Sequence, residues 1–335
     1  MSLETIWLLL LGLLLVGYFV LGGYDYGVQM LQRGLAHGES ERRLALNSFG
    51  PFFLGNEVWL VATAGVLMGA FPKLEGALFT GMYAPIAVIV GAVVLGTVSV
   101  QLRSRHGSRA ARAVWDTLAL VGGLVAAAGW GIVLGLLLHG LPMTARGTFA
   151  VGAAELLDPF VLLCAATTLT LFAGHGAAFI AMRTRDALRE RATRTGRSLL
   201  AAAAVLAVAT AVLGAAGGVS ARGWAAALPA AALVVALGVA ALALTRRAPR
   251  LAFAASCCAA GLPVLIVGFG LYPNLLSSAR DGGPSLPIAH AVADTATLQL
   301  LLPVAVLMIP LLTAFQMVSW WAFRVRAGSR PPTYL

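Results

Sequence analysis

The chain has 335 residues, of which 60% are hydrophobic and only 11% are charged, with a formal net charge of +10 and a mean hydropathy of +0.89. Soluble globular domains carry about 25% charged residues, so this composition excludes an ordinary soluble protein. A positive balance can indicate nucleic-acid binding, but no platform of interleaved aromatic and basic residues accompanies it here. We therefore expect no nucleic-acid partner.

Nine apolar segments follow one another along the chain, and each is about long enough to cross some 30 Å of hydrocarbon as a helix. Sheet edges cannot be satisfied in lipid, so helices are favoured. The gaps are too short for a separate soluble domain. We predict an all-α membrane protein with nine transmembrane helices in a single polytopic membrane domain, residues 1–335. The predicted spans are 5–28, 46–70, 77–100, 114–138, 152–182, 198–219, 223–245, 251–272 and 294–322.

Basic residues occupy alternate gaps between these segments. All but four of the 23 lysines and arginines fall after the first, third, fifth or seventh span, or in the C-terminal tail. Such residues are retained on the cytoplasmic side of a membrane. The pattern predicts an N-terminus outside the cell and a cytoplasmic C-terminus. The four exceptions are Lys73, Arg146, Arg222 and Arg280.

Two of the longer gaps have a distinctive composition. The gap at 183–197 carries opposite charges at helical spacing, such as Glu190 and Arg194, and we interpret it as a connector on the membrane surface. The gap at 273–293 contains several prolines and glycines, and we interpret it as an irregular surface loop. Three small-residue motifs predict close helix contacts. They are Gly23-x-x-x-Gly27, Gly65-x-x-x-Gly69 and Gly131-x-x-x-Gly135.

Charged groups inside a membrane are costly and are functional candidates by default. Glu57 lies about eleven residues into its predicted span, or about 16 Å from the cytoplasmic start, which is mid-membrane. Asp25 lies near the cytoplasmic end of the first span. Both are candidates for passing protons. The alternative is that Glu57 is neutral and only forms a hydrogen bond with a neighbouring helix.

The other acidic residues at membrane borders are expected to have ordinary roles at helix starts or at the interface. These are Asp116, Glu155, Asp158 and Asp294.

His175 is a lone histidine late in the fifth span. A histidine there can pack, relay protons or bind haem, and we favour packing or a relay over ligation. No Cys/His spacing typical of a metal site and no nucleophile motif occurs, so we expect no metal ion and no catalytic residue in this chain.

Two stretches, 18–31 and 50–72, carry the most specific motifs of the chain. With them the chain resembles subunit II of the cytochrome bd-type quinol oxidases, a family with nine spans and an external N-terminus. Weaker matches are Arg42-Arg43, Asp158-Pro159, Tyr272-Pro273-Asn274 and Trp320-Trp321. The motif residues to which the resemblance gives structural roles are Gly22, Gly27, Gly55, Asn56 and Trp59.

The resemblance implies a complex in the bacterial plasma membrane that oxidises quinol and reduces O2 to water. Haems b and d are expected in the partner, subunit I, and none in this chain. Some members hold a structural quinone or lipid. Further expected partners are a small single-helix subunit, the quinol and O2 that reach the complex, and membrane lipid. This chain would support subunit I and supply part of a cytoplasmic proton route through Asp25, Glu57 and His175.

One departure from the family pattern concerns that route. The family motif reads Trp-Asp-Gly-Asn-Glu-Val-Trp, and here Phe53 and Leu54 replace the Trp-Asp pair. Either Glu57 works with Asp25 and ordered water, or the route runs through the partner subunit. Two other functions remain as alternatives: a secondary transporter or ion-translocating membrane protein, and an independent haem-binding cytochrome. Unmatched Gly and Pro interruptions and an odd number of spans disfavour the transporter.

Overall fold

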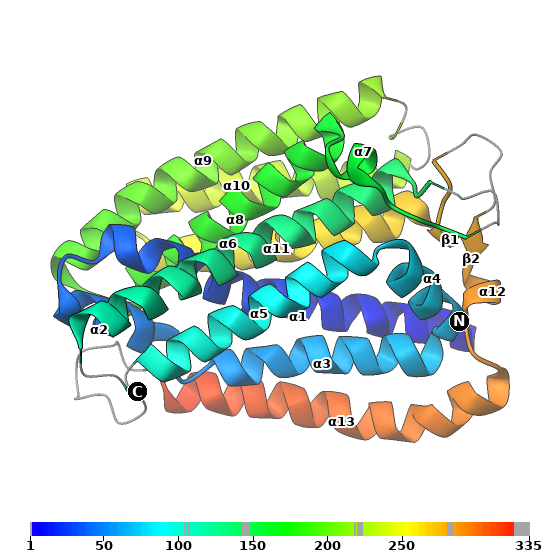
Figure 1. Cartoon of the computed structure of the whole chain (residues 1–335), viewed down its shortest axis with the longest axis horizontal. Helices are drawn as coiled ribbons and strands as arrows, with labels where there is room; N and C mark the ends of the chain where they lie inside the picture. Colours follow the sequence, from blue (N-terminus) through cyan, green and yellow to red (C-terminus); the bar gives the residue numbers. More distant parts are fainter. Residues whose placement is uncertain are drawn as a thin grey trace.

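The computed structural model describes residues 2–103, 105, 108–142, 148–217, 219, 224–279 and 285–324. Within this part of the chain, nine helices are long and apolar enough to cross a membrane, and they run side by side in one bundle (Figure 1). The predicted fold class is confirmed. The nine are α1 (Leu3–Leu35), α3 (Phe53–Ala70), α5 (Tyr83–Arg103), α6 (Arg109–His139), α8 (Pro159–Arg183), α9 (Asp186–Ala216), α10 (Ala227–Thr245), α11 (Pro249–Leu271) and α13 (Thr295–Ala322).

Shorter elements connect these helices. They are α2 (Glu39–Phe49), α4 (Pro72–Gly81), α7 (Ala153–Leu156), the 3-10 turn η2 (Trp224–Ala226), β1 (Asn274–Leu276), β2 (Leu286–Pro287) and α12 (Ile288–Ala291). Figure 1 shows two ends of the bundle: α2 and the end of α13 lie at one, and the start of α1, α4, α12 and the strands lie at the other. We call the first the basic end. There α1, α5, α8, α10 and α13 finish.

The second predicted span, 46–70, is wrong at its start. The chain breaks between α2 and α3, where Pro51 lacks the N–H that would continue a helix. Glu57 consequently lies only four residues after the first residue of α3, a rise of about 6 Å rather than 16 Å. The third predicted span, 77–100, likewise combines the end of α4 with α5.

The segment 183–197 is mostly helical, as its charge spacing indicates. It forms the first three turns of α9, which continues without a break to Ala216, and its position at the membrane surface stays a prediction. The Glu190 and Arg194 side chains lie 3.9 Å apart across one turn. Opposite charges at this spacing support a helix, and no proline follows Arg185 in the segment.

The predicted irregular loop at 273–293 contains regular structure. β1 and β2 pair antiparallel, with Asn274 opposite Pro287 and Leu276 opposite Leu286, and α12 follows. Residues 280–284 lie outside the described part. The backbone N–H of Ala293 donates to Ala70 O at 2.9 Å, which fixes the end of this connection against α3.

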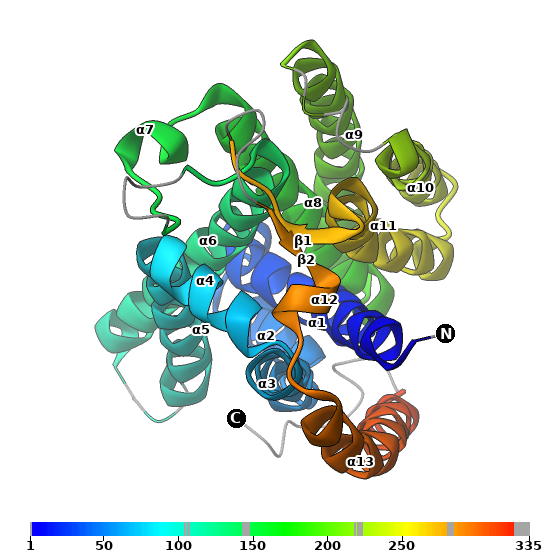
Figure 2. The same ribbon diagram turned by 90° about the vertical axis from the view of Figure 1, so that its right-hand side faces the viewer.

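α1 lies near the centre of the bundle, in contact with α3, α6, α8 and α11. Two of the small-residue motifs lie at close contacts: Gly27 faces Gly176 of α8, and Gly131 faces Ala165 of the same helix. In the third motif, Gly65 meets nothing within 4 Å, whereas a Cβ at Gly69 would lie 3.1 Å from Leu301 Cδ1 of α13. α13 lies at the edge of the bundle against α3, and most of its surface is exposed (Figure 2).

The charge asymmetry that predicts the orientation has a structural counterpart. Antiparallel neighbours place the gaps after the first, third, fifth and seventh spans at the basic end. Of the four exceptions, Lys73 lies at the start of α4, at the opposite end. Arg146, Arg222 and Arg280 lie outside the described residues. The direction of the bundle across the membrane stays a prediction.

Candidate functional site

Asp25 and Asn56 meet where α1, α3 and α13 come together. The Nδ2 atom of Asn56 lies 2.9 Å from Asp25 Oδ2 and 2.7 Å from the Tyr24 hydroxyl. On the other side, Gln316 Nε2 of α13 donates to Asn56 Oδ1 at 3.0 Å. Asp25 is 5% exposed and Asn56 is fully buried. The amide of Asn56 therefore connects a buried carboxylate with two other helices.

Glycines and one tryptophan of the motif shape this junction. The Trp59 ring of α3 lies against Gly17, and the Tyr18 ring lies over Gly22. Gly55 faces Phe315 of α13, where a Cβ would lie 3.0 Å from the ring. These residues let α1, α3 and α13 approach closely enough for the Asp25–Asn56–Gln316 contacts.

Asp25 lies deeper than the sequence predicted. α1 continues for ten residues beyond it to Leu35, a distance of about 15 Å along the axis. The expectation that Asp25 is near water at the helix end is wrong, because the predicted span stopped at residue 28.

Glu57 faces another neighbour. Thr97 Oγ1 of α5 donates a hydrogen bond to Glu57 Oε1. Consecutive residues on a helix point about 100° apart, so Asn56 faces α1 while Glu57 faces α5. Leu54, where the family pattern has an aspartate, is 56% exposed on the outer face of α3.

His175 is fully buried between α1, α8 and α11. Its Nε2 atom lies 2.9 Å from Val20 O, and its Nδ1 atom lies 2.7 Å from Ser256 Oγ. Since a carbonyl only accepts, Nε2 carries the proton. The ring stacks on Phe253 with centroids 5.1 Å apart. Both ring nitrogens have protein partners, so this histidine does not fit the role of an axial haem ligand. Within the described residues, no three His, Cys, Asp or Glu side chains gather as metal ligands.

Two further polar residues of α1 share the face of Asp25. Gln29 and Gln32 follow it at i+4 and i+7, which places all three on one side of the helix. They are 4% and 0% exposed. Gln32 Nε2 donates to the backbone oxygen of Asp116 at 3.3 Å. No protein atom of the described residues bonds Asp25 Oδ1 or the Oε1 atoms of Gln29 and Gln32. Three buried acceptors thus line one path along α1.

This path ends at a buried ion cluster at the basic end. Arg103 of α5 binds Asp116 of α6 and also Glu39 of α2, with Arg103 Nη2 and Glu39 Oε2 2.9 Å apart. Arg42 approaches Asp116 Oδ2 at 3.6 Å. Arg103 is 4% exposed and Asp116 is fully buried. The predicted helix-start or interfacial role of Asp116 is therefore wrong: it is the acidic centre of this cluster.

The other three border acids do take helix-start roles. Asp158 Oδ1 accepts from the backbone N–H of Phe160 at 2.9 Å, and Asp294 Oδ1 accepts from that of Thr297 at 3.0 Å. Glu155 Oε2 accepts from Gly152 N at 2.8 Å.

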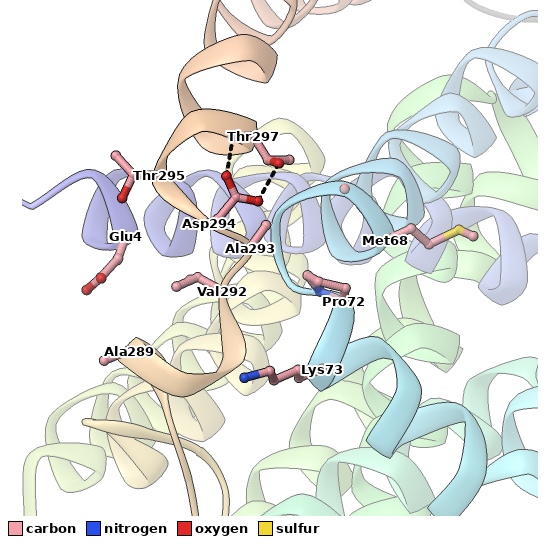
Figure 3. Close-up of a pocket in the computed structure, with 11 residues that line it drawn as sticks. Glu4, Met68, Pro72, Lys73, Ala289, Val292, Ala293, Asp294, Thr295 and Thr297 are labelled. Atoms are coloured by element: carbon pink, nitrogen blue, oxygen red, sulfur yellow. Dashed lines mark hydrogen bonds between the residues drawn. The ribbon is translucent and has the colours of Figure 1, made fainter.

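An open hollow lies at the opposite end, between α1, the α3–α4 turn and the start of α13 (Figure 3). Glu4, Lys73 and Asp294 are its charged residues. The Asp294 carboxylate already accepts two hydrogen bonds, one from the backbone N–H of Thr297 and one from the Thr297 hydroxyl group. None of Asp25, Glu57 and His175 lines this hollow. We therefore place the candidate site along α1 and not here.

Comparisons with known proteins all indicate the same family. The family model for cytochrome bd terminal oxidase subunit II matches residues 3–323. The chain is 28% identical over 333 residues to cytochrome bd ubiquinol oxidase subunit 2 of Bacillus subtilis, and the match covers 99% of this chain and 98% of the relative.

A second relative is cytochrome bd-I ubiquinol oxidase subunit 2 of Escherichia coli, 33% identical over 199 residues, which are 58% of this chain and 52% of the relative. That match spans about half the length of the relative. Among solved structures, a chain of bd oxidase from Geobacillus thermodenitrificans has the same fold, with a TM-score of 0.74 at 19% identity. The match covers 97% of this chain and 99% of that one.

Proposed function

The chain belongs to the cytochrome bd terminal oxidase subunit II family, and from this premise we propose that it delivers protons from the basic end of the bundle to the haem-bearing subunit of an oxidase. Its relatives are subunits of a cytochrome bd ubiquinol oxidase, an oxidoreductase complex, and it is a multi-pass membrane protein of bacteria. On this proposal, the complex oxidises quinol and reduces O2 to water, and subunit I holds haems b and d.

The observation that carries the proposal is the line of buried acceptors on α1. Asp25, Gln29 and Gln32 extend over about 11 Å of helix. An unpaired buried acceptor costs about 1–3 kcal/mol, and buried water normally satisfies such groups. Gly96 of α5 and Gly123 of α6 pack directly against Gln29, where a Cβ would lie 2.4 Å and 3.0 Å from its side chain. A file of ordered water along this face would satisfy all three oxygens and conduct protons between them.

The ion cluster would connect this file to the aqueous phase. Glu39 keeps 37% of its side chain exposed while it binds Arg103. Arg103 in turn binds Asp116, whose backbone oxygen accepts from Gln32. Glu39 offers a carboxylate at the surface and Asp116 one behind it, and carboxylates can take up and pass on protons.

Asp25 would be the inner acceptor of the route, with Glu57 beside it. Leu54, at the place of the family's second carboxylate, is exposed and points away from the Asp25–Asn56 contact. This position favours a route through Asp25 and Glu57 over a route that needs a carboxylate at residue 54. We assign His175 a packing role, because both of its ring nitrogens are already bonded. A small single-helix subunit and a structural quinone or lipid stay predictions.

Nothing in the described residues favours the transporter alternative, and the bonding of His175 disfavours an independent cytochrome. This chain also supports subunit I on our proposal. A chain that serves as a partner in this way should purify together with a haem protein.

Three substitutions in the assembled complex test the route: Asp25→Asn, Gln29→Leu and Glu57→Ala. Quinol-driven oxygen consumption should fall at least tenfold for Asp25→Asn, because proton transfer by a positioned group typically contributes 100-fold or more. Gln29→Leu and Glu57→Ala should give smaller losses. Haem spectra should stay normal in all three, which separates lost proton delivery from lost assembly.

Thr170→Val serves as the control, because the Thr170 hydroxyl donates to Ala166 O of its own helix. Unchanged turnover with normal spectra in Asp25→Asn would exclude the route along α1. The same result in Glu57→Ala would remove Glu57 from it.

A further inference from the structure

A second basic feature lies apart from the proton route, at the same end of the bundle. It is a hollow between the start of α9 and the turn that joins α10 to α11. We call it the α9–α11 hollow. Its lining residues are Arg189, Glu190, Thr193, Leu244, Arg247 and Pro249.

The hollow favours an anion. In the described part of the chain, neither Arg189 nor Arg247 forms an ion pair. The one carboxylate in the lining, Glu190, is shared with Arg194 at 3.9 Å. The first turn of α11 also borders the hollow, and its N-cap residue, Ala248, offers no side-chain hydrogen bond to the free N–H groups. Such groups at the start of a helix attract negative charge.

Arg247 occupies a backbone position that usually belongs to glycine. Its φ angle is +56°. Arg247 N donates to Leu244 O at 3.2 Å, and Ala248 N donates to Ala243 O at 2.9 Å. These two bonds form a Schellman motif, in which glycine is the preferred residue. The turn itself therefore does not need an arginine, and glycine at this position would preserve the backbone.

The helices that border the hollow carry exposed apolar side chains along their length. On α9, Val205 is 69% exposed and Val212 is 63% exposed. On α10, Val235 and Leu242 are 64% and 48% exposed. Both helices are candidate membrane spans, so they combine exposed apolar side chains with a positively charged hollow at the basic end. A phospholipid matches this combination, because it joins an anionic headgroup to acyl chains.

We propose that the α9–α11 hollow binds the headgroup phosphate of an anionic phospholipid, with Arg189, Arg247 and the Thr193 hydroxyl as its ligands. The acyl chains lie along the exposed faces of α9 and α10. This site is independent of the proton route, since no residue of that route lines it.

Titration of the purified, delipidated oxidase complex with phosphatidylglycerol tests the proposal, with thermal unfolding as the measurement. Phosphatidylglycerol should raise the unfolding temperature, whereas phosphatidylcholine and inorganic phosphate should not. Each basic residue near a membrane surface contributes about 1 kcal/mol to anionic lipid binding. Arg247→Gly and Arg189→Gln should therefore each weaken the apparent affinity about fivefold.

The matched control is Arg105→Gly, which removes the same charge at the basic end, outside the hollow. It should titrate like the unchanged complex. Native mass spectrometry of the unchanged complex supplies a second measurement, and one tightly held phosphatidylglycerol should be retained that Arg247→Gly loses. Equal titration of all variants would overturn the proposal. An equal temperature rise with phosphatidylcholine would overturn it too, and so would one with inorganic phosphate, which would indicate a simple anion site.

Discussion

At Gly27 the backbone of α1 crosses that of α8 with no room for a side chain. A Cβ atom there would collide with the carbonyl oxygen of Phe172 and with the backbone of Gly176. The atoms that such a Cβ would meet are all main-chain atoms, so rotation of a side chain cannot relieve the collision. This crossing also sets where Asp25, two residues earlier on α1, meets Asn56.

We predict that Gly27→Ala destabilises the protein by about 3 kcal/mol or more, at the upper end of what overpacking usually costs. Thermal unfolding of the complex measures this effect. Gly34→Ala is the control on the same helix, because no atom lies within 4 Å of a Cβ at that position. It should be neutral or slightly stabilising. Equal unfolding temperatures for the two variants would contradict the close crossing.

At the scale of single residues, the sequence indicates which groups are unusual but not what they contact. Asp25 and Glu57 are conspicuous because they are carboxylates in apolar surroundings. Gln316 lies 260 residues from Asn56 in the chain, and no local pattern predicts that pair. The alignment of Gln29 and Gln32 with Asp25, in contrast, can be predicted from the sequence. Polar residues at i+4 and i+7 share one face of an apolar helix.

Among the elements, α2 depends most on charge. Glu39 binds Arg103, Arg43 and Arg112, and Glu41 binds Arg191 of α9. Burial acts to raise the pKa of Glu39, but the hydrogen bonds and charge of Arg103 outweigh it, so its pKa lies below the ordinary 4.5. The hydrogen bond from Arg191 lowers the pKa of Glu41 in the same direction.

A carboxylate whose pKa is lowered by folding stabilises the folded state above its unfolded pKa, and this contribution is lost as pH falls through the folded pKa. We therefore predict that α2 loosens below about pH 4.5 while the spanning helices stay folded. Hydrogen exchange over 39–49, corrected for intrinsic rates, measures this. In the double variant Glu39→Gln, Glu41→Gln, exchange should already be fast at neutral pH. Equal protection of α2 at neutral and acidic pH would exclude the charge-based attachment.

The sequence predicts elements best where hydrophobicity changes sharply at both ends. The predicted spans 251–272 and 294–322 agree closely with α11 and α13. The predicted helix ends are wrong where a helix break falls within an apolar run, as at Gly50-Pro51 between α2 and α3. They are also wrong where a helix continues into polar sequence, as in the first turns of α9. Hydropathy reports contact with lipid, whereas helix ends depend on backbone hydrogen bonds.

For the whole molecule, orientation is the property on which the direction of proton delivery depends. The antiparallel bundle separates the arginine-rich loops from Lys73, which lies at the opposite end. Retention of basic residues on the cytoplasmic side predicts that the basic end, with Glu39 and Arg103, faces the cytoplasm. The ion cluster would then receive protons from inside the cell.

Cysteine labelling in intact cells measures this orientation. The native cysteines, Cys164, Cys257 and Cys258, are first replaced by alanine. A membrane-impermeant maleimide should then label Lys73→Cys in intact cells, but Arg105→Cys only after the membrane is permeabilised. Arg105 lies between α5 and α6 at the basic end. The reverse pattern would place Glu39 and Arg103 outside the cell. The buried acceptors of α1 could then no longer draw protons from the cytoplasm, whatever the effect of Asp25→Asn on turnover.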